Sequence, residues 1–600
     1  MAREWRVYSK KADFDAIAEK FGIDRLTAGL LVNRGVREDR DIDKYLNGGL
    51  KDLYDPMLLP DMERAVDRVK DSIITGKHIR IVGDYDIDGV CSVYILIRGL
   101  TFFAERIFGD LLKKESEEKK CELPVPVIDH VIPDRIRDGY GINRHIIERA
   151  VEEKVDVIIT CDNGISAIDE LEYARDNGLS VIVTDHHEVR KDEEGRDILP
   201  PCDAVTDPKR SDSIYPLSGI CGAVVAWKLV WALLRELTEE SREVALKVCF
   251  EELLPFAAVA TVGDVMELLD ENRIIVREGL KLINSGRLLN LGMRKLIEGC
   301  GIADKEIGSY HIGFVIGPCI NAGGRLETAE TALRLFMSTD EKSACALSEK
   351  LIELNARRKE MTEEGVKKAC ELCEKDYADD KVLVVYLGDL HESLAGIVAG
   401  RIRERYSKPA FVITDAEEGL KGSGRSIEAY HMFDKLCEVA DILEKFGGHP
   451  MAAGLSLKRE NLDELRKRLN EGCGLTEDDL KEKKGIDFII PVSYITSGLI
   501  EEMDILKPFG QGNEKPVLAD RELSATDIRI LGKNKNVLKL RLIDKNGYNI
   551  SGIMFGDGEE NAEKIKDIMS KKGSVSIVYY PEINVFNGRR SLQLTLLDIL

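Results

Sequence analysis

The sequence predicts an α/β protein with a doubly wound parallel sheet, a second and smaller α/β domain, and a β-barrel at the end. Three observations predict this fold class. Short apolar runs at 79–82, 155–159 and 181–183, separated by helical segments, are typical of parallel strands. The charged stretch 338–377 is poor in Gly and Pro and indicates a long connecting helix. After residue 485, short alternating segments with turn signals favour a small barrel.

The sequence also predicts the elements between these segments and the bounds of the domains. Within the sheet region, 168–177 is predicted to be a helix closed by Gly178. The charged insert 105–122 is interpreted as a solvated helix or loop, and 475–484 as a linker. We therefore expect an N-terminal segment at 1–74, the first α/β domain with its helical part at 75–337, the connecting helix at 338–378, the second α/β domain at 379–474 and the barrel at 485–600.

The composition indicates a reduced, intracellular protein. The net charge of -22 argues against a nucleic-acid-binding protein whose surface is basic overall, although a local basic groove remains compatible with this charge. The thirteen cysteines are scattered, and the single close pair, Cys370 and Cys373, is weak support for zinc or redox chemistry. The N-terminus lacks an apolar signal core, and the apolar stretch 223–234 contains Lys228 and is too short to span a bilayer. We expect no membrane anchor.

Metal-binding side chains follow all three apolar runs. The first run leads into Asp84, Asp86 and Asp88, the second into Asp162, and the third into Asp185, His186 and His187. Because ligands bind at the carboxyl ends of parallel strands, these clusters should converge on one edge of the sheet. Carboxylates packed this closely repel one another unless a cation neutralises them, and oxygen ligands with imidazole suit Mg²⁺ or Mn²⁺. A single Asp at a strand end usually caps a helix, but three such ends favour a metal site.

The arrangement predicts a pair of metal ions. Asp264 follows the apolar helix 256–260 and fits either a buried helix cap or a further ligand. Asp162 stands alone on its strand between the other clusters and is the candidate bridge between two ions. His186 and His187 should point apart on an extended strand end, one towards metal and one towards substrate. Two metals of this kind indicate hydrolysis of a phosphoryl ester by in-line displacement.

Asp185-His186-His187, together with the run 84–89, resembles the DHH phosphoesterase superfamily, and the match narrows to the RecJ family of single-strand-specific exonucleases. The remaining motifs cover nearly the whole chain. They are 133–135, 139–141, 162–164 and 261–264 in the amino half, 317–325 between the lobes, 391–401, 422–426 and 447–454 in the second, DHHA1 domain, and 508–513 at the entry to the OB-fold. The departures from the family pattern are modest. Met266-Glu267 stands where a more apolar pattern that includes a proline is expected, and the charged insert before Cys121 is longer than expected.

The resemblance implies a Mn²⁺- or Mg²⁺-dependent exonuclease with two metal ions. It would degrade single-stranded DNA from its 5′ end, releasing nucleotides, in recombination and repair. By matching motifs, the metal ligands would be Asp86, Asp88, Asp162, His186 and Asp264. Asp84 and His187 would be close supporting or catalytic residues beside Asp162.

Five residues are candidates for substrate binding. They are Arg135, Arg325, Ser423, Arg425 and His449. The Gly-rich segment 422–426 fits a plain turn or a phosphate site, in which backbone N–H groups, hydroxyls and Arg hold the anion, and the resemblance favours the second.

The tail combines positive and aromatic residues in the manner of OB-folds that hold single strands. The residues are Lys533, Lys535, Lys539, Arg541, Tyr548, Phe555, Tyr579, Tyr580 and Phe586. Most of these aromatics are expected in the barrel core, so the binding function is predicted for the domain and for no single aromatic.

Two other functions are compatible with parts of this pattern. A phosphodiesterase for cyclic dinucleotides or very short oligonucleotides would share the metal cluster, but such relatives are shorter or carry membrane and sensor segments. A catalytically dead DNA-binding scaffold would have lost metal ligands, whereas every candidate ligand is present here. For the exonuclease we expect single-stranded DNA as the substrate, a single-stranded-DNA-binding protein and a helicase as candidate partners, a monomer, and a cytoplasmic location.

Overall fold

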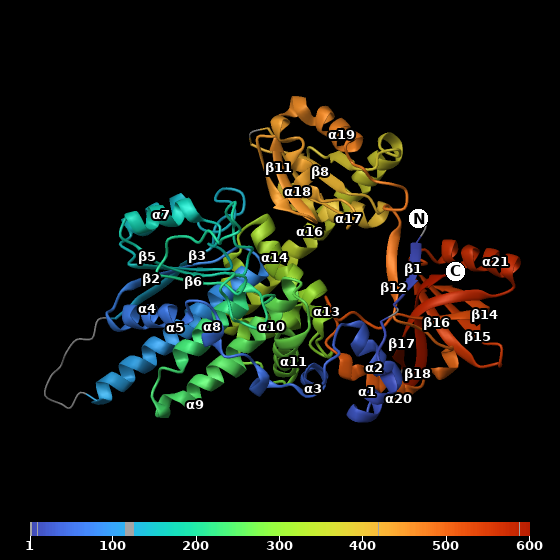
Figure 1. Cartoon of the computed structure of the whole chain (residues 1–600), viewed down its shortest axis with the longest axis horizontal. Helices are drawn as coiled ribbons and strands as arrows, with labels where there is room; N and C mark the ends of the chain where they lie inside the picture. Colours follow the sequence, from blue (N-terminus) through green and yellow to red (C-terminus); the bar gives the residue numbers. More distant parts are fainter. Residues whose placement is uncertain (1–2, 9, 115–124, 418, 587) are drawn as a thin grey trace. The chain divides into compact units, whose positions relative to one another are not determined.

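The computed structural model describes residues 3–600 apart from 9, 115–124, 418 and 587 (Figure 1). The chain forms two compact units. Unit 1 comprises Leu53–Met266 and Ile274–Lys481, and unit 2 comprises Ala2–Asp52, Glu267–Arg273 and Glu482–Leu600.

Unit 1 begins with a parallel sheet whose strand order is β3-β2-β4-β5-β6. Its strands are β2 (His78–Val82), β3 (Val127–Val131), β4 (Val157–Cys161), β5 (Ser180–Thr184) and β6 (Ala204–Thr206). Every residue of β4 and β5 is buried, which explains their continuous apolar runs: parallel strands covered on both faces have no solvent side. The predicted parallel sheet is confirmed.

Helices cover both faces of this sheet (Figure 1). One face carries α6 (Arg144–Glu152) and α7 (Ile168–Asp176), whose apolar residues pack against the strands. The other face carries α4 (Met62–Ile74), α5 (Ile87–Lys114) and α8 (Gly222–Leu234). The helix predicted at 168–177 is therefore confirmed, and the sheet is doubly wound.

Helix α5 is the longest apolar helix of this region. Its segment Ile87–Gly109 has the length and mean hydropathy, 1.5, to cross a membrane, yet 83% of its most apolar window is buried inside the protein. It packs against α8 and α10 (Leu254–Gly263), which fits a core helix. The predicted charged insert begins within α5, and its residues 115–122 lie outside the described residues.

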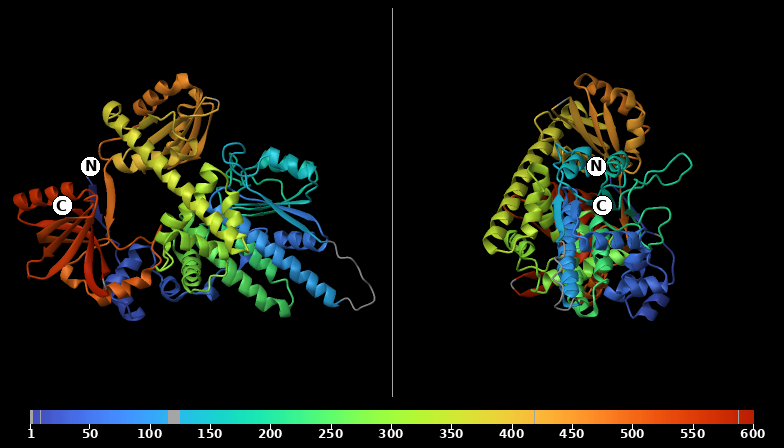
Figure 2. Two further views of the ribbon diagram at one scale, coloured as in Figure 1. Left: turned by 180° about the vertical axis from the view of Figure 1, so that it is seen from behind. Right: turned by 90° about the vertical axis from the view of Figure 1, so that its left-hand side faces the viewer.

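A helical part follows and ends in the predicted connecting helix. Its helices are α9 (Glu239–Lys247), α10, α11 (Asp270–Asn284), α12 (Leu291–Gly299), α13 (Ser309–His311), α14 (Gly317–Leu326) and α15 (Glu330–Phe336). Helix α16 (Glu341–Asp376) is the long helix that follows (Figure 2), and it runs for 36 residues. The Asp340 side chain caps it by accepting a hydrogen bond from the Ser343 N–H. This helix leads to the second α/β domain.

The second sheet has the order β10-β11-β9-β8-β7, in which β7 and β8 are parallel and the other neighbours antiparallel. Its strands are β7 (Leu383–Tyr386), β8 (Ala410–Asp415), β9 (Leu420–Arg425), β10 (Lys445–His449) and β11 (Ala452–Leu457), and its helices are α17 (Ala395–Tyr406), α18 (Met432–Cys437) and α19 (Leu462–Glu471). The Gly-rich segment 422–426 lies largely on β9, so the plain-turn interpretation is wrong. Neighbours on both sides pair with this strand and hold it extended.

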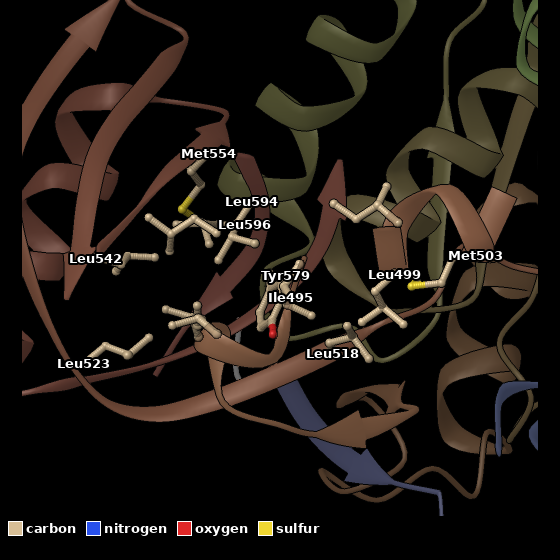
Figure 3. Close-up of a cluster of buried hydrophobic side chains, with 14 of the residues drawn as sticks. Ile495, Leu499, Met503, Leu518, Leu523, Leu542, Met554, Tyr579, Leu594 and Leu596 are labelled. Atoms are coloured by element: carbon tan, nitrogen blue, oxygen red, sulfur yellow. The ribbon is translucent and has the colours of Figure 1, made fainter. Parts of the chain in front are cut away.

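Unit 2 contains a closed barrel. Strands β14, β15, β16, β18 and β17 pair in that order, and β17 pairs back with β14 to close the ring. The elements are β13 (Phe488–Ile489), α20 (Ser497–Met503), β14 (Leu518–Leu531), β15 (Val537–Ile543), β16 (Asn549–Phe555), α21 (Gly558–Lys572), β17 (Val575–Phe586) and β18 (Arg589–Ile599). Side chains such as Leu518, Leu542 and Tyr579 fill its core (Figure 3). The predicted barrel is confirmed.

The first fifty residues complete unit 2. Strand β1 (Arg3–Val7) pairs in parallel with β12 (Glu482–Ile486). Helices α1 (Phe14–Phe21), α2 (Arg25–Asn33) and α3 (Asp39–Asn47) precede α4, and Leu30 and Ile42 lie in the same hydrophobic cluster as the barrel core. The segment 1–74 is thus divided, because α4 belongs to unit 1.

Candidate metal centre

The carboxyl ends of three adjacent strands gather the predicted acidic cluster. Strand β4 lies between β2 and β5, so the residues that follow these strands meet at one edge of the sheet. Asp84 and Asp86 lie between β2 and α5, Asp162 directly follows β4, and Asp185 directly follows β5. Asp88, two residues after Asp86, lies in the first turn of α5. The predicted convergence is therefore present.

His186 contacts three carboxylates through a single nitrogen. Its Nε2 atom lies 3.0 Å from Asp162 Oδ1, 3.5 Å from Asp88 Oδ2 and 3.8 Å from Asp264 Oδ2. Burial lowers the pKa of His186, and the nearby charge of Asp88 opposes this effect only in part. A neutral imidazole is the form that binds a metal ion.

The potential ligand atoms form overlapping groups, each with its atoms within 4.8 Å of one another. The groups are Asp84, Asp86 and Asp162; Asp88, His186 and Asp264; and Asp162, His186 and His187. The five predicted metal ligands, and both predicted supporting residues, are all brought together. Asp162 belongs to the first and third of these groups, and His186 belongs to the second and third. Together these two residues connect all three groups.

Helix α8 holds two of the acids in place. Its first backbone N–H groups, from Gly222 and Ala223, donate to the two oxygens of Asp88 over 2.7 and 2.8 Å. A helix N-terminus favours negative charge, so α8 stabilises Asp88 in its buried position. A Cβ atom on Gly222 would lie 2.7 Å from the Cβ atom of Asp162, so the close approach of α8 to β4 requires glycine here.

The site carries more negative charge than its surroundings compensate. Burial, followed by repulsion from neighbouring carboxylates, raises the pKa of Asp84, Asp86 and Asp162, and raises the pKa of Asp264 to about 8. Asp84 Oδ1 and His186 Nδ1 are buried without a hydrogen-bond partner among the described residues. A divalent cation would relieve the repulsion, and this oxygen-rich donor set fits Mg²⁺ or Mn²⁺.

His187 points to a different set of neighbours from His186. Its Nδ1 atom lies 2.7 Å from Asp185 Oδ1, and the Tyr140 hydroxyl lies 3.2 Å from its Nε2. Burial alone would lower the pKa of His187, but the hydrogen bond and charge of Asp185 raise it to about 9. The two histidines thus have different partners, although their ring centroids lie 4.5 Å apart, and His187 is 40% exposed.

Asp185 and Tyr140 are functional candidates whose roles the sequence analysis missed. Asp185 accepts hydrogen bonds from the Ile165 and His186 backbone N–H groups as well as contacting the ring of His187. The Tyr140 hydroxyl donates to the Asp162 carbonyl oxygen over 2.7 Å. The signal for Asp185 was its place at the end of an apolar run, separated from it only by Thr184 and directly before the two histidines.

The candidate phosphate ligands Ser423 and Arg425 lie on β9, facing the start of α17. A Cβ atom on Gly396 would lie 2.9 Å from both Ser423 Oγ and Arg425 Nη2. Arg425 Nη1 also lies 3.3 Å from Ser423 Oγ. Arg325, on α14, donates to the Ser393 carbonyl oxygen over 3.0 Å, just before α17 begins. A helix N-terminus next to a hydroxyl and a guanidinium suits a phosphate.

His449 shares a face of the sheet with Arg425. Across the strands β9, β11 and β10, Arg425 pairs with Ala452, and Ala452 pairs with His449. Residues opposite one another on neighbouring strands point to the same face. His449 is exposed at the end of β10.

The arginines of this region repel one another. Burial, followed by the charges of Arg135 and Arg358, lowers the pKa of Arg325 to about 10. Burial, followed by Arg135 and Arg403, lowers the pKa of Arg425. Arg135 stacks over the Tyr85 ring at 4.7 Å. Among the described ion pairs, none joins Arg135, Arg325 or Arg425 to a carboxylate. Such a cluster of positive charge favours an anionic ligand.

Comparison with known proteins agrees with this geometry. The single-stranded-DNA-specific exonuclease RecJ of Bacillus subtilis is 34% identical to this chain over 599 residues, which is 99% of the chain and 70% of that relative. The chain belongs to the RecJ family. The RecJ exonuclease of Haemophilus influenzae is 32% identical, and the match covers 92% of each protein.

The domain models and solved structures of the RecJ family cover the same parts. The DHH family, N-terminal domain, matches 78–259, the DHHA1 domain matches 379–474, and the RecJ OB domain matches 486–598. The crystal structure of RecJ in complex with Mn²⁺ from Thermus thermophilus covers 99% of this chain and 79% of that one, with a TM-score of 0.78 and 26% identity. The structure of exonuclease RecJ bound to manganese covers 70% of this chain, with a TM-score of 0.57 and 31% identity. The predicted fold class and family are confirmed.

Proposed function

We propose that this RecJ-family chain is a metal-dependent exonuclease that hydrolyses single-stranded DNA from the 5′ end and releases nucleotides, in DNA recombination and repair. The observation that carries the proposal is the set of overlapping ligand groups joined through Asp162 and His186. A bridging carboxylate with further acids on each side is what a pair of divalent ions requires. The family relationship supports the same activity.

The two ions, Mn²⁺ or Mg²⁺, would activate a water molecule and neutralise charge on the scissile phosphate. Asp86, Asp88, Asp162, His186 and Asp264 are proposed to hold them, with Asp162 as the bridge. Asp84 completes the set from the β2 side, where one of its buried oxygens has no partner among the described residues. Relatives of known structure contain Mn²⁺, which supports this donor set.

His187 is proposed to act on substrate. Its ring is partly exposed and is protonated at neutral pH, because Asp185 raises its pKa to about 9. A protonated imidazole can donate a hydrogen bond to a phosphate oxygen or a proton to a leaving oxygen. Asp185 lies 2.7 Å from Nδ1 of the ring, and the Tyr140 hydroxyl lies 3.3 Å from Nδ1 and 3.2 Å from Nε2, so both groups help to hold the ring in place.

The DHHA1 domain is proposed to bind the 5′ phosphate through Ser423, Arg425 and Arg325, with Arg135 and His449 as further contacts. A terminal phosphate carries an additional charge and free oxygens that an internal phosphate lacks. The uncompensated arginines and the start of α17 supply the matching donors. Recognition of this end would explain why the enzyme starts at a terminus and proceeds in the 5′-to-3′ direction.

Three further features belong to the proposal. Single-stranded-DNA-binding protein and a helicase are the proposed partners, and the protein is proposed to be a cytoplasmic monomer. The described cysteines are all free thiols, which supports a reducing location.

The outer face of the barrel is proposed to hold the long single strand, and exposed Lys539 and Arg541 support this.

One assay tests the proposed activity. Single strands with a 5′ phosphate and a 3′ label are incubated with the full chain, with Mn²⁺, with Mg²⁺, or with EDTA. Shortening from the 5′ end with release of mononucleotides is expected with either metal and none with EDTA. A duplex of the same sequence is the control and should persist. Internal cuts, or equal degradation of strand and duplex, would contradict the proposal.

A further inference from the structure

Two cysteines from different helices meet next to the interlobe motif. Cys300 directly follows α12, and Cys319 lies near the start of α14. Their sulfur atoms are 3.9 Å apart, a van der Waals contact. Cys319 is 2% exposed, whereas Cys300 is half-buried. An oxidant from solvent can therefore reach the sulfur of Cys300, and the sulfur of Cys319 lies next to it on the interior side.

The neighbouring groups make the two thiols unequal. The Asn355 side-chain amide donates to Cys319 Sγ over 3.3 Å, and the Val315 carbonyl oxygen lies 3.3 Å from the same sulfur. The contact with Cys319, helped by the charge of Lys359, lowers the pKa of Cys300, whereas the contact with Cys300 and burial raise the pKa of Cys319. Cys300 is the more exposed of the two sulfurs and is therefore placed to react first, and Cys319, which contacts it from the interior, is placed to resolve it.

We propose that Cys300 and Cys319 are a redox-modification site that closes to a disulfide under hydroperoxide and reopens with a dithiol reductant. The Cys300 thiolate attacks one peroxide oxygen, the O–O bond breaks, and a sulfenic acid and one water result. The Cys319 sulfur then attacks the Cys300 sulfur, the S–O bond breaks, and a second water leaves. The two thiols lose two electrons and two protons, and hydrogen peroxide is reduced to two waters.

Closure is expected to act on α14, because Cys319 and the proposed binding residue Arg325 both lie on this helix. A disulfide needs its sulfur atoms about 2.0 Å apart, so roughly half of the present separation must be lost. Gly324, on the same helix, lies so close to the Tyr85 carbonyl oxygen that a Cβ atom would be 2.2 Å from it. Arg325 follows directly and contacts Ser393. This consequence rests on the proposed function: oxidation is expected to raise KM for 5′-phosphorylated strands several-fold.

A mass measurement tests the site without any activity assay. The reduced full-length protein is treated with hydrogen peroxide in EDTA, free thiols are alkylated, and the peptides are mapped. We expect a linked peptide containing Cys300 and Cys319 that disappears with dithiothreitol. Cys370 and Cys373, on α16, are the matched control pair and should remain alkylated as free thiols. Oxidation of Cys300 to sulfinic acid with no linked peptide would overturn the proposal.

Variants separate the modification from its effect. Cys300→Ser and Cys319→Ala should each abolish the linked peptide, and the activity of Cys300→Ser should become insensitive to peroxide. Wild-type activity should fall on oxidation and return with reductant, while Cys373→Ser behaves as wild type. A linked peptide with unchanged KM would overturn the effect on α14. A reduced protein without exonuclease activity would refute the proposed function, and the mass result would still decide the disulfide.

Discussion

Asp162 combines a strained backbone with a central place in the cluster. Its φ of 61° lies in the left-handed region, which Asp and Asn tolerate better than other non-glycine residues. Such strain persists where the surrounding structure holds a residue for a functional purpose. The Tyr140 hydroxyl binds its carbonyl oxygen, and His186 contacts its carboxylate. These contacts hold the proposed bridge in one position.

Replacing Asp162 should abolish hydrolysis and leave the fold intact. Water cannot replace a bridging carboxylate without loss of the metal pair. Asp162→Asn is the sharper variant, because Asn tolerates the left-handed backbone, whereas Asp162→Ala adds about 1–2 kcal/mol of strain. Nucleotide release at saturating Mn²⁺ and the thermal unfolding midpoint are measured for both. Substantial turnover in either variant would contradict the proposed bridging role of Asp162.

His187→Ala should lower turnover more than metal affinity. Loss of a positioned proton donor costs about 10²–10⁴-fold in rate. His186→Ala is the matched control and should weaken metal binding, since its Nε2 faces three carboxylates. Isothermal titration with Mn²⁺ and single-turnover rates are compared for the two variants. The roles are reversed if the metal titration shifts strongly for His187→Ala and not for His186→Ala.

Arg425→Ala should erase most of the preference for 5′-phosphorylated over 5′-hydroxyl strands. A hydrogen bond to a charged group contributes about 1.5–3 kcal/mol, which corresponds to roughly 10–100-fold. Arg425→Lys should rescue poorly, because lysine lacks the planar fork. The ratio of cleavage rates on the two strand types is measured, with Mn²⁺ affinity as the control. An unchanged ratio would place the phosphate elsewhere, with Arg135 the next candidate.

At the scale of elements, the start of α8 links two strands of the cluster. Its first N–H groups bind Asp88, which comes from the β2 side, and its backbone passes next to Asp162, which follows β4. The helix thereby sets the spacing between acids that lie 74 positions apart in the chain. Its position requires a glycine, because no side chain fits between α8 and Asp162.

Gly222→Ala is therefore expected to damage the site without removing any ligand. The new Cβ atom would lie 2.7 Å from Asp162 Cβ, and a displacement of about 1 Å in a catalytic group can cost about 10²-fold in rate. Gly308→Ala is the matched control, since a Cβ there meets nothing within 4 Å. Rates and unfolding midpoints are measured for both variants. Wild-type activity in Gly222→Ala would mean that α8 does not position Asp162.

At the scale of the whole molecule, the barrel depends on distant parts of the chain. Residues of α2 and α3 share its hydrophobic cluster, and the Arg273 guanidinium donates to the carbonyl oxygens of Tyr45 and Leu506. Deleting the chain after residue 485 would uncover the apolar faces of α2 and α3. Substitutions on the barrel surface are therefore a cleaner test of its role than truncation.

The exposed face of β15 is expected to contribute to binding of long strands. Lys539 and Arg541 alternate with the buried Leu538, Leu540 and Leu542, so both cations point outwards. The variant Lys539→Glu with Arg541→Glu should weaken binding of long strands and reduce its salt dependence, yet leave hydrolysis of short oligonucleotides unchanged. Lys566→Glu with Lys572→Glu on α21 is the charge-matched control. Equal affinity in wild type and the β15 variant would refute this role.

The aromatics of the tail show where prediction by composition ends. Tyr579 is fully buried in the core, whereas Phe555 is 61% exposed, and the two are alike in type and in strand context. The side chain of Phe586 lies outside the described residues. Burial depends on which face of a closed barrel a residue takes, and closure depends on the pairing of β14 with β17.

The sequence by itself determined the parallel sheet, the convergence of its acids and the long helix. These follow from local patterns, because continuous apolar runs specify buried strands, and parallel strands end at one edge. Only the tertiary structure decided the support of the cluster by α8, Asp185 and Tyr140, the placement of Ser423 on a strand, and the contact between Cys300 and Cys319. Each of these depends on packing between elements distant in the chain, which no local pattern records.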